Sequence, residues 1–454
     1  MEKTIAAIST PHAVGGISVI RISGGEAIQI ADRVFRGVSG RKLEEHKGYT
    51  AAYGQVCSGG RMLDEAVALV FRAPKSYTGE DVVELSCHGG LYNTREVLRA
   101  VLDAGASPAG PGEFTRRAFL HGKIGLTQAE AVAELIQARN GQAVRAALAM
   151  REGRLFEKIT AIKDSLLTLA GHLSAWVDYP EEEIPEIGQT EIEAVLVQAL
   201  EKLTQLLCSY DRGRMLREGV DTVIVGKPNV GKSTLMNQLA GFQKSIVTDI
   251  AGTTRDIVEE IVDLGDLSLR LADTAGIRQT EDPVEKIGVD FAKKRLQSAQ
   301  LVLAVFDSSE SLTEEDLLLI EDVSEHPCIA VVNKSDLETK MDLDFLKSRF
   351  SSMVFVSAKE ETGMEELRRE MIRVLRLGDL DASAAMLFNE RQRSGAQQAV
   401  SALQEALDTL RAGMTLDAVT VSVESALESL MELTGEKVSD RVVDEVFSHF
   451  CVGK

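Results

Sequence analysis

The sequence contains no run of about 18 or more consecutive apolar residues, the length that a membrane-spanning helix needs. Its first residues, Met1 to Thr4, lead into a strand-like pattern rather than into the basic and then apolar pattern of a secretory signal. We therefore expect a cytoplasmic protein that makes no use of a membrane.

Cysteines are few, and none of them forms a CxxC pair. An odd number of widely spaced cysteines argues against both a disulfide framework and a zinc site, so a reducing compartment fits best. The five are Cys57, Cys87, Cys208, Cys328 and Cys451.

Basic charge is also scarce. The chain has 50 Lys and Arg against 70 Asp and Glu, which gives a net charge of −20. This is the wrong sign for a protein that binds nucleic acid through its overall field. Any contact with RNA must be local, or a partner must supply most of the basic surface.

The length of 454 residues exceeds what one hydrophobic core usually serves, so we expect two or three domains. Residues 1–120 mix short β-like runs with glycine pairs, which predicts an α+β domain. Five charged residues beside or just after these turns have two interpretations: they line a ligand cleft, or they are ordinary solvated surface charges. Their spacing alone favours the second interpretation. They are Arg21, Glu84, Arg116, Arg117 and Lys123.

A helical region is expected over residues 121–216, where Thr127 to Glu130 has the form of a capping box. An acidic run between two prolines, within residues 178–186, breaks it; we interpret this run as a solvated turn rather than a metal site. Helical periodicity returns in residues 379–454. We infer one discontinuous helical domain into which residues 217–378 are inserted, with two separate helical layers as the alternative.

Residues 217–378 alternate strand and helix patterns, which predicts a Ras-like, doubly wound sheet. The fold class is thus multidomain, with α/β, α+β and all-α parts. The expected strands are 221–226, 257–263, 267–273, 301–307, 328–333 and 353–357, and the expected helices are 285–296, 313–323 and 364–377.

Gly226 to Ser233 reads Gly-Lys-Pro-Asn-Val-Gly-Lys-Ser between an apolar run and a helical pattern. This is the pattern of a phosphate-binding loop, in which Lys232 reaches the β- and γ-phosphates and the Ser233 hydroxyl ligates Mg²⁺. A plain glycine turn would lack the preceding strand and the following helix. The loop residues expected to contact the nucleotide are Asn229, Val230, Gly231, Lys232, Ser233 and Thr234.

Later motifs at strand ends complete the pattern of a GTPase. Thr254 is the candidate second Mg²⁺ ligand, and Asp273 is expected to hold the Mg²⁺ shell. The Asp336 carboxylate can accept two N–H bonds from guanine, which selects GTP over ATP. The residues of these motifs are Thr253, Thr254, Asp273, Thr274, Ala275, Gly276, Asn333, Lys334, Asp336, Ser357, Ala358 and Lys359.

Ile277 stands where many regulatory GTPases place the glutamine that orients the attacking water. Glu285 is a candidate replacement, or it is an ordinary first-turn acid favoured by the helix dipole. No arginine is obviously placed as a finger, and a monovalent cation held by the Asn229 side chain can neutralise the same charge.

Together these features resemble the MnmE (TrmE) family of tRNA-modification GTPases over essentially the whole chain. The Cys-x-Gly-Lys end is the most specific signature, because many GTPases share the other motifs. The signatures are Gly226 to Ser233, Thr248 to Asp256, Pro111 to Phe114, Tyr77 to Asp81 and Cys451 to Lys454.

The resemblance implies a homodimer joined through N-terminal domains, with GTP hydrolysis stimulated when two G domains meet across K⁺. It implies that Glu285 orients water and that Lys232 acts in catalysis. The residues that it assigns to K⁺ are Asn229, Thr248, Ile250 and Thr253, and those that it assigns to Mg²⁺ are Ser233 and Thr254.

The resemblance also implies a site for 5-formyl- or methylene-tetrahydrofolate at Arg21, Glu84, Lys123 and Lys454. Cys451 is a nucleophile for the one-carbon unit or a packed thiol. Where the family usually reads Asn-Gly-Lys-Leu-Asp-Leu, this sequence has His121 to Leu126, so Asn is replaced by His121 and Asp by Gly125. His121 takes over the role of the asparagine amide or is a neutral surface histidine.

In the family, a flavoprotein partner, MnmG, uses FAD and NADH in a heterotetramer-type complex with the GTPase. The complex adds an aminomethyl-type group to C5 of the wobble uridine, U34, of certain tRNAs. The alternative is a regulatory GTPase of ribosome assembly without RNA-modifying activity, which would have no use for a folate site.

Overall fold

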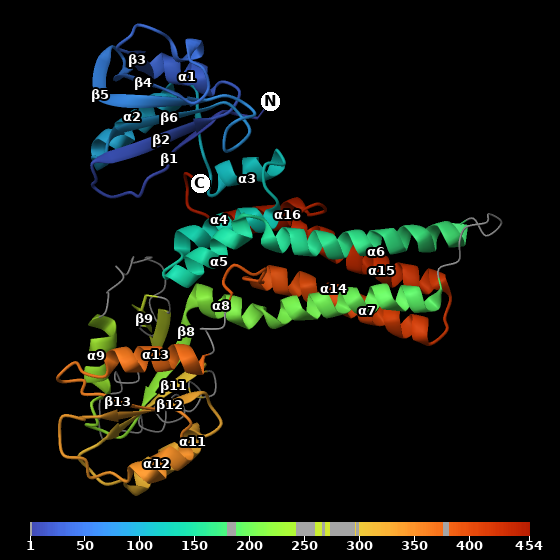
Figure 1. Cartoon of the computed structure of the whole chain (residues 1–454). Coiled ribbons are helices and arrows are strands. Elements are labelled where there is room, and N and C mark those ends of the chain that lie inside the picture. Colours follow the sequence, from blue (N-terminus) through green and yellow to red (C-terminus); the bar gives the residue numbers. More distant parts are fainter. Residues whose placement is uncertain are drawn as a thin grey trace, which may run out of the picture. The chain divides into compact units, whose positions relative to one another are not determined.

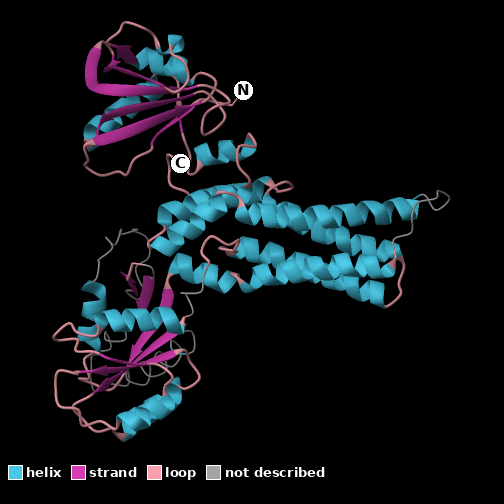
Figure 2. Cartoon of the chain, viewed as in Figure 1, coloured by secondary structure: helices cyan, strands magenta, loops and turns pink. Residues whose placement is uncertain are grey.

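The computed structural model describes residues 2–178, 188–241, 259–265, 268–272, 296, 299–375 and 381–454. The chain divides into two compact units. Figure 1 labels their helices and strands, and Figure 2 colours these elements by type. The first unit contains Met1–Ala133, Phe156–Glu201 and Gly395–Lys454, and the second contains Glu134–Leu155 and Lys202–Ser394.

The first unit begins with a seven-stranded sheet in the order β3-β4-β5-β6-β2-β1-β7. Neighbouring strands are antiparallel except β1 and β7. The strands are β1 (Ile5–Ile8), β2 (Ile17–Ser23), β3 (Phe35–Gly37), β4 (Thr50–Ser58), β5 (Arg61–Phe71), β6 (Val82–His88) and β7 (Ser107–Pro108). The helical elements are α1 (Ala27–Val34), the 3₁₀ turn η1 (Leu43–Glu45) and α2 (Leu91–Asp103).

One face of this sheet is covered by α1 and α2, and the strand sequences alternate accordingly. Ile20 and Ile22 of β2 are fully buried in a core that includes Ile28 of α1 and Val97 of α2. Arg21 lies between the two isoleucines, and successive strand residues point to opposite faces, so its side chain lies on the other face of the sheet. This alternation puts a charged residue of β2 on the face away from the two helices.

The helices of the first unit join chain segments from both sides of residues 217–378. The Lys163 ammonium contacts the two Glu436 carboxylate oxygens at 2.5 and 2.7 Å, and Arg411 contacts Glu193 at 2.7 Å. The domain boundaries expected from the sequence stay predictions. These helices are α3 (Glu113–Leu120), α4 (Leu126–Gln137), α6 (Arg154–Asp178), α7 (Gln189–Cys208), α14 (Glu390–Arg411), α15 (Leu416–Thr434) and α16 (Asp440–Ser448).

The capping box expected at Thr127 to Glu130 is wrong. Helix α4 begins at Leu126, so Thr127 lies inside its first turn. The side chain of Gln128 instead accepts a hydrogen bond from the Gly125 N–H at 2.9 Å. Leu126 is fully buried in a cluster with Val443 and Phe447, and this burial favours the earlier helix start over the polar pattern.

The second unit contains the expected doubly wound sheet, in the order β13-β12-β11-β8-β10-β9. All neighbouring strands are parallel except β9 and β10. The strands are β8 (Val220–Val225), β9 (Glu259–Asp263), β10 (Ser268–Ala272), β11 (Leu301–Asp307), β12 (Cys328–Asn333) and β13 (Met353–Phe355). The helices are α5 (Gly141–Arg151), α8 (Tyr210–Glu218), α9 (Lys232–Gly241), α11 (Glu314–Val323), α12 (Leu343–Arg349) and α13 (Met364–Val374).

The central strands of this sheet are apolar on both faces. Every residue of β11 is buried, as expected for a parallel strand covered on both sides by helices. Apart from residue 296, the expected helix 285–296 lies outside the described residues.

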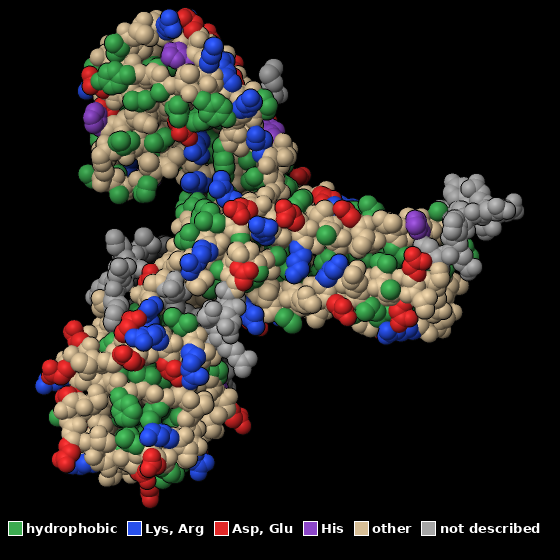
Figure 3. Space-filling model, in the orientation of Figure 1, with side chains coloured by type: hydrophobic (Ala, Val, Ile, Leu, Met, Phe, Trp, Pro, Cys, Tyr) green, Lys and Arg blue, Asp and Glu red, His purple; other side chains and the backbone are tan. Residues whose placement is uncertain are grey.

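The surface of the second unit mixes charges of both signs, with Asp and Glu side chains lying among Lys and Arg on the face that Figure 3 shows. In the part of the chain that the structure describes, no helix combines the length and apolar character that a membrane crossing requires.

The close approach of α3 to the C-terminal helix gives a first prediction. Gly112 has φ +61°, and a Cβ there would lie 2.8 Å from the Phe450 Cβ and 3.0 Å from the Phe447 carbonyl oxygen. Gly122 has φ +66°, but a Cβ there would meet no atom within 4 Å. We expect Gly122→Ala to cost ~1 kcal/mol for the left-handed backbone alone. Gly112→Ala should cost about 2 kcal/mol more from overlap.

Thermal unfolding of the two variants, followed by circular dichroism, compares these costs at matched backbone strain. Equal unfolding temperatures for Gly112→Ala and Gly122→Ala would contradict the close approach of α3 to residues 447–450.

Candidate functional site

The loop between β8 and α9 requires glycine at both of its close approaches. Gly226 has φ +153°, and a Cβ there would lie 2.4 Å from the Val305 carbonyl oxygen. Gly231 has φ +98°, and a Cβ there would lie 2.2 Å from the Asn333 Nδ2 atom. Main-chain atoms can therefore turn around a phosphate only because these two positions lack side chains.

Lys232, the first residue of α9, folds back over this loop. Its Nζ donates hydrogen bonds to the carbonyl oxygens of Gly226 and Lys227, both at 2.7 Å. Burial lowers the pKa of Lys232 below its usual range, because an ammonium is less well solvated there. The same donors suit phosphate oxygens, so the loop fits the terminal phosphates of a nucleotide.

Asn229 and Ser233 also lie in this loop. Asn229 adopts a left-handed backbone with φ +65°, and Ser233 is exposed in the first turn of α9. Their expected K⁺ and Mg²⁺ roles stay predictions.

The buried amide of Asn333 joins the phosphate loop to residues 333–336, here called the guanine loop because Asp336 is expected to select guanine. The Asn333 Nδ2 donates to the Val230 carbonyl oxygen at 2.7 Å, and its Oδ1 accepts from the Ala358 N–H at 3.0 Å. Asn333 is 2% exposed, so these bonds satisfy an amide that water does not reach. Three segments that lie far apart in the sequence thus meet at one side chain.

Asp336 lies at the rim of this arrangement and is exposed. Its Oδ1 accepts a hydrogen bond from the Ser357 hydroxyl at 2.5 Å, and this bond lowers the pKa of Asp336. The carboxylate is therefore ionised at neutral pH and can accept N–H bonds from a base edge.

Sequence reasoning missed the residue that holds Lys334. The Lys334 ammonium pairs with Asp307, the last residue of β11, and the Ser308 hydroxyl donates to the Lys334 carbonyl oxygen at 2.8 Å. Burial alone would raise the pKa of Asp307, but the bonds from Lys334 and Ser309 outweigh it and lower the pKa. The only sequence signal was a carboxylate at the end of a parallel strand, where ligand sites of such sheets gather.

Several expected site residues lie outside the described part of the chain. They are Thr248, Ile250, Thr253, Thr254, Asp273, Thr274, Ala275, Gly276, Ile277 and Glu285.

In the first unit, Arg21 and Glu84 form an ion pair across β2 and β6 with an Nε–Oε1 distance of 2.8 Å. The Arg21 guanidinium also lies 5.6 Å from the centre of the Tyr77 ring and 5.5 Å from that of Phe114. The side chains of Arg21 and Glu84 are 17% and 22% exposed, so the interpretation as solvated surface charges is wrong for this pair. Their pairing orients the guanidinium between two aromatic rings.

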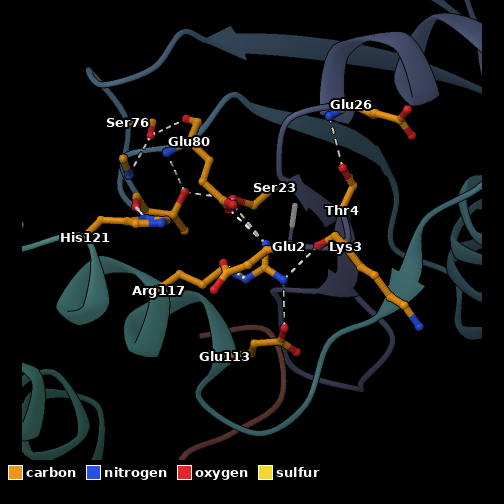
Figure 4. Close-up of polar contacts among 12 residues, drawn as sticks. Glu2, Lys3, Thr4, Ser23, Glu26, Ser76, Glu80, Glu113, Arg117 and His121 are labelled. Atoms are coloured by element: carbon orange, nitrogen blue, oxygen red, sulfur yellow. Dashed lines mark hydrogen bonds and ion pairs between the residues drawn. The ribbon is translucent and has the colours of Figure 1, made fainter.

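Arg117 was also expected at the surface, but it is buried and holds three segments together (Figure 4). Its Nη1 contacts both Glu80 carboxylate oxygens at 3.0 Å, and its Nη2 contacts Glu113 at 2.9 Å and the Lys3 carbonyl oxygen at 2.8 Å. Arg116, in contrast, is partly exposed and pairs with Asp444 at 3.2 Å. Arg117 therefore fixes the loop before β6 against α3 and the residues that precede β1.

The C-terminal motif lies against the same part of the first unit. The Phe114 N–H donates to the Lys454 carbonyl oxygen at 3.1 Å, and the Ser9 hydroxyl donates to the Gly453 carbonyl oxygen at 3.0 Å. Gly453 has φ +99°, and a Cβ there would lie 2.2 Å from the Ile8 carbonyl oxygen. The main chain of Lys454 is thus next to Phe114, whose ring contacts Arg21, while Cys451 is exposed.

Lys123 and His121 follow α3 and contact the loop before β6. The exposed Lys123 ammonium donates to the Pro74 carbonyl oxygen at 2.9 Å, and His121 Nδ1 lies 2.7 Å from the Thr78 carbonyl oxygen. His121 thus has a hydrogen-bonding role, and this contact assigns its N–H to Nδ1.

One group of metal-binding type occurs among the described residues, formed by Glu2, Glu80 and His121 with ligand atoms within 4.8 Å of one another. The Arg117 guanidinium already pairs with the Glu80 carboxylate and lies 4.0 Å from that of Glu2. A cation there would have to compete with a buried positive charge, so we assign no metal to this group.

Comparison with known proteins covers the whole chain. Residues 4–123 match the family model described as the GTP-binding protein TrmE N-terminus, and residues 126–451 match that described as the MnmE helical domain. Two relatives named tRNA modification GTPase MnmE are similar to this chain. That of Acetivibrio thermocellus is 41% identical, covering 100% of this chain and 99% of that protein. That of Heliobacterium modesticaldum is 44% identical, covering 99% of both.

Among solved structures, the G domain of the iron transporter FeoB of T. maritima is 28% identical. The match covers 34% of this chain and 96% of that chain, with a TM-score of 0.27.

The Asn333 amide gives a second prediction. Asn333→Ala leaves the Val230 carbonyl and the Ala358 N–H without this partner, so GTP binding should weaken by about 2 kcal/mol, roughly thirtyfold. Equilibrium titration with a fluorescent GTP analogue measures the loss. Ser335→Ala, an exposed change in the same turn, is the matched control and should bind normally. Unchanged affinity in Asn333→Ala would show that the loops hold their positions without the amide.

Proposed function

The chain belongs to the MnmE family of tRNA modification GTPases, and from this premise we propose that it helps to install an aminomethyl-type group at C5 of U34 in certain tRNAs. GTP hydrolysis is the activity of this family, and binding of GTP with Mg²⁺ and interaction with tRNA follow from membership. The carbon unit would come from 5-formyl- or methylene-tetrahydrofolate, and a flavoprotein of the MnmG type would supply FAD and NADH chemistry in the cytoplasm.

The observation that carries this proposal is the position of the C-terminal motif beside the Arg21–Glu84 pair. Lys454 is joined through its main chain to Phe114, and Phe114 contacts the Arg21 guanidinium. A folate has a flat pterin ring with several donors and acceptors and a carboxylate tail. Arg21, Glu84, Lys123 and Lys454 supply charges of both signs, and Tyr77 and Phe114 supply apolar ring surface, which suits such a ligand. Cys451 is a candidate nucleophile because it is exposed at this end of the chain.

For hydrolysis, we propose that Lys232 stabilises charge on the phosphates and that Glu285 orients the attacking water, since Ile277 has no polar group. Asn229, Thr248, Ile250 and Thr253 would hold K⁺, and Ser233 and Thr254 would hold Mg²⁺. The cation and a second G domain across it would supply the positive charge that an arginine finger gives in other GTPases. Support comes from Asn229, which lies in the phosphate loop with an exposed side chain.

Homodimerisation through the N-terminal domains and assembly with the flavoprotein are further parts of the proposal. The net charge of −20 on this chain supports a complex in which the partner provides most of the basic surface that binds tRNA.

The dependence on the cation gives a third prediction. The steady-state GTPase rate should fall at least about tenfold when K⁺ is replaced by Na⁺ at equal ionic strength, because an oxygen cage sized for K⁺ fits the smaller ion poorly. Asn229→Ala should be slow in both salts, because the variant lacks the side-chain oxygen. Equal rates of the unchanged protein in K⁺ and Na⁺ would disprove the K⁺ mechanism.

The substrate proposal gives a fourth prediction. Mass spectrometry of tRNA from cells that lack this protein should show loss of the C5 modification at U34, and the gene should restore it. Arg21→Leu should fail to restore the modification while retaining GTPase activity, because Arg21 lies in the other unit from the phosphate loop. Arg33→Leu, an exposed arginine change on α1, is the control.

Unchanged U34 in the deletion strain, together with altered ribosome profiles, would support the ribosome-assembly alternative. Full restoration by Arg21→Leu would instead remove the folate site from the proposal and leave the GTPase role intact.

A further inference from the structure

We propose that Lys227, the residue after the first glycine of the phosphate loop, is a positioning residue for GTP. Its side chain ties the phosphate loop to residues 307–316, here called the bridging segment, which also holds the guanine loop. This inference rests on the GTPase activity of the family and not on the proposed folate chemistry.

Lys227 reaches from the phosphate loop to two carboxylates. Its Nζ lies 3.1 Å from the Asp316 Oδ2 and 3.2 Å from the Glu310 Oε2. The side chain of Lys227 is 12% exposed and that of Asp316 is 1% exposed, whereas that of Glu310 is 60% exposed. Salt screens the contact with Glu310 but hardly reaches the contact with Asp316, so Asp316 is the stronger partner.

Asp316 is held in place by the N-terminus of α11. Its Oδ2 accepts hydrogen bonds from the Thr313 N–H at 2.9 Å and from the Thr313 hydroxyl at 2.8 Å. The first of these bonds belongs to a capping box, in which the Thr313 side chain in turn accepts from the Asp316 N–H. Helix α11 in turn packs on β11 through the buried residues Ile320 and Val323. The anchor for Lys227 is therefore a rigid part of the fold rather than a surface side chain.

The same carboxylate has a second oxygen, Oδ1, that is buried without a hydrogen-bond partner in the described structure. Lys227 is the cation that lies against this buried carboxylate. Burial alone would lower the pKa of Lys227, but the bonds to Asp316 and Glu310 outweigh it and raise the pKa. The ammonium is charged throughout the physiological range, so the tie does not vary with pH there.

The bridging segment links the two halves of the nucleotide site. At its start, Asp307 pairs with Lys334, and the Ser308 hydroxyl bonds to the Lys334 main chain at 2.8 Å. At its end, Asp316 holds Lys227. The Lys227 carbonyl also accepts the Lys232 ammonium at 2.7 Å, so one residue joins the catalytic lysine of the loop to the bridging segment.

Lys227 acts through the loop and not on the nucleotide. A loop that is already in its binding conformation loses less conformational freedom when phosphate arrives, so the tie favours GTP and GDP binding. The benefit is the same before and in the transition state, and such an interaction changes KM without changing kcat. A raised KM with an unchanged kcat in a Lys227 variant would therefore distinguish a positioning role from a catalytic one.

The test uses the full-length protein and the variant Lys227→Met. We expect the KM for GTP and the Kd for GDP to rise about tenfold, the loss of one hydrogen bond to a charged group, with kcat within about twofold of the parent. Lys227→Arg, which can still pair with Asp316, should restore most of the affinity. Lys347→Met, which removes an exposed lysine of α12 in the same unit, is the matched control.

A second variant separates positioning from stability, because Lys227→Met leaves a buried carboxylate without its counter-charge. Lys227→Met/Asp316→Asn removes that charge, and asparagine can still accept the bonds from Thr313. The unfolding temperature should return toward that of the parent while the KM stays raised. Recovery of the KM together with stability would overturn the proposal, as would a fall in kcat with an unchanged KM.

The comparison of GTP with inosine triphosphate adds a final criterion. Inosine lacks the 2-amino group that a carboxylate at Asp336 accepts, so the ratio of the two KM values reports on the guanine loop. The ratio should be the same in Lys227→Met and in the parent, because Lys227 acts on the phosphate loop. A ratio that falls toward unity would place the effect in the guanine loop and contradict the proposal.

Discussion

The return of the C-terminus to the first strand constrains the whole chain. Gly453 and Lys454 are bound by Ser9 and Phe114, so residues separated by more than 300 positions must meet. The chain that follows Phe114 must therefore return to this region at its C-terminal residues. The pairing of Lys163 with Glu436 and of Arg411 with Glu193 follows the same requirement, since outgoing and returning helices lie side by side in the first unit.

Both candidate sites depend on one buried polar side chain that binds several loops. Asn333 joins the phosphate loop to the loop after β13, and Arg117 joins the residues before β1, the loop before β6 and α3. A buried amide or guanidinium is costly unless its groups are paired, and the pairing allows one arrangement of the loops. Each site therefore depends on a buried polar side chain that fixes the loops around it.

The sequence predicted the elements better than their side-chain environments. The strands of the doubly wound sheet were within about two residues of their observed ends, because β11 and β12 are continuous apolar runs with a clear end. The start of α4 was missed because burial of Leu126 outweighed the polar pattern at Thr127. The phosphate loop was recognisable because only glycine fits at Gly226 and Gly231. Arg117 was assigned to the surface because spacing does not reveal the carboxylates of Glu2 and Glu80, which come from other segments.

The contacts of Lys232 have a consequence for nucleotide exchange. A lysine that served phosphate alone would be left half-buried and unpaired whenever the product departs. Here the carbonyl oxygens of Gly226 and Lys227 receive the ammonium. This pairing offsets the cost of burying the ammonium, so release of a phosphate leaves Lys232 with hydrogen-bond acceptors in its own loop.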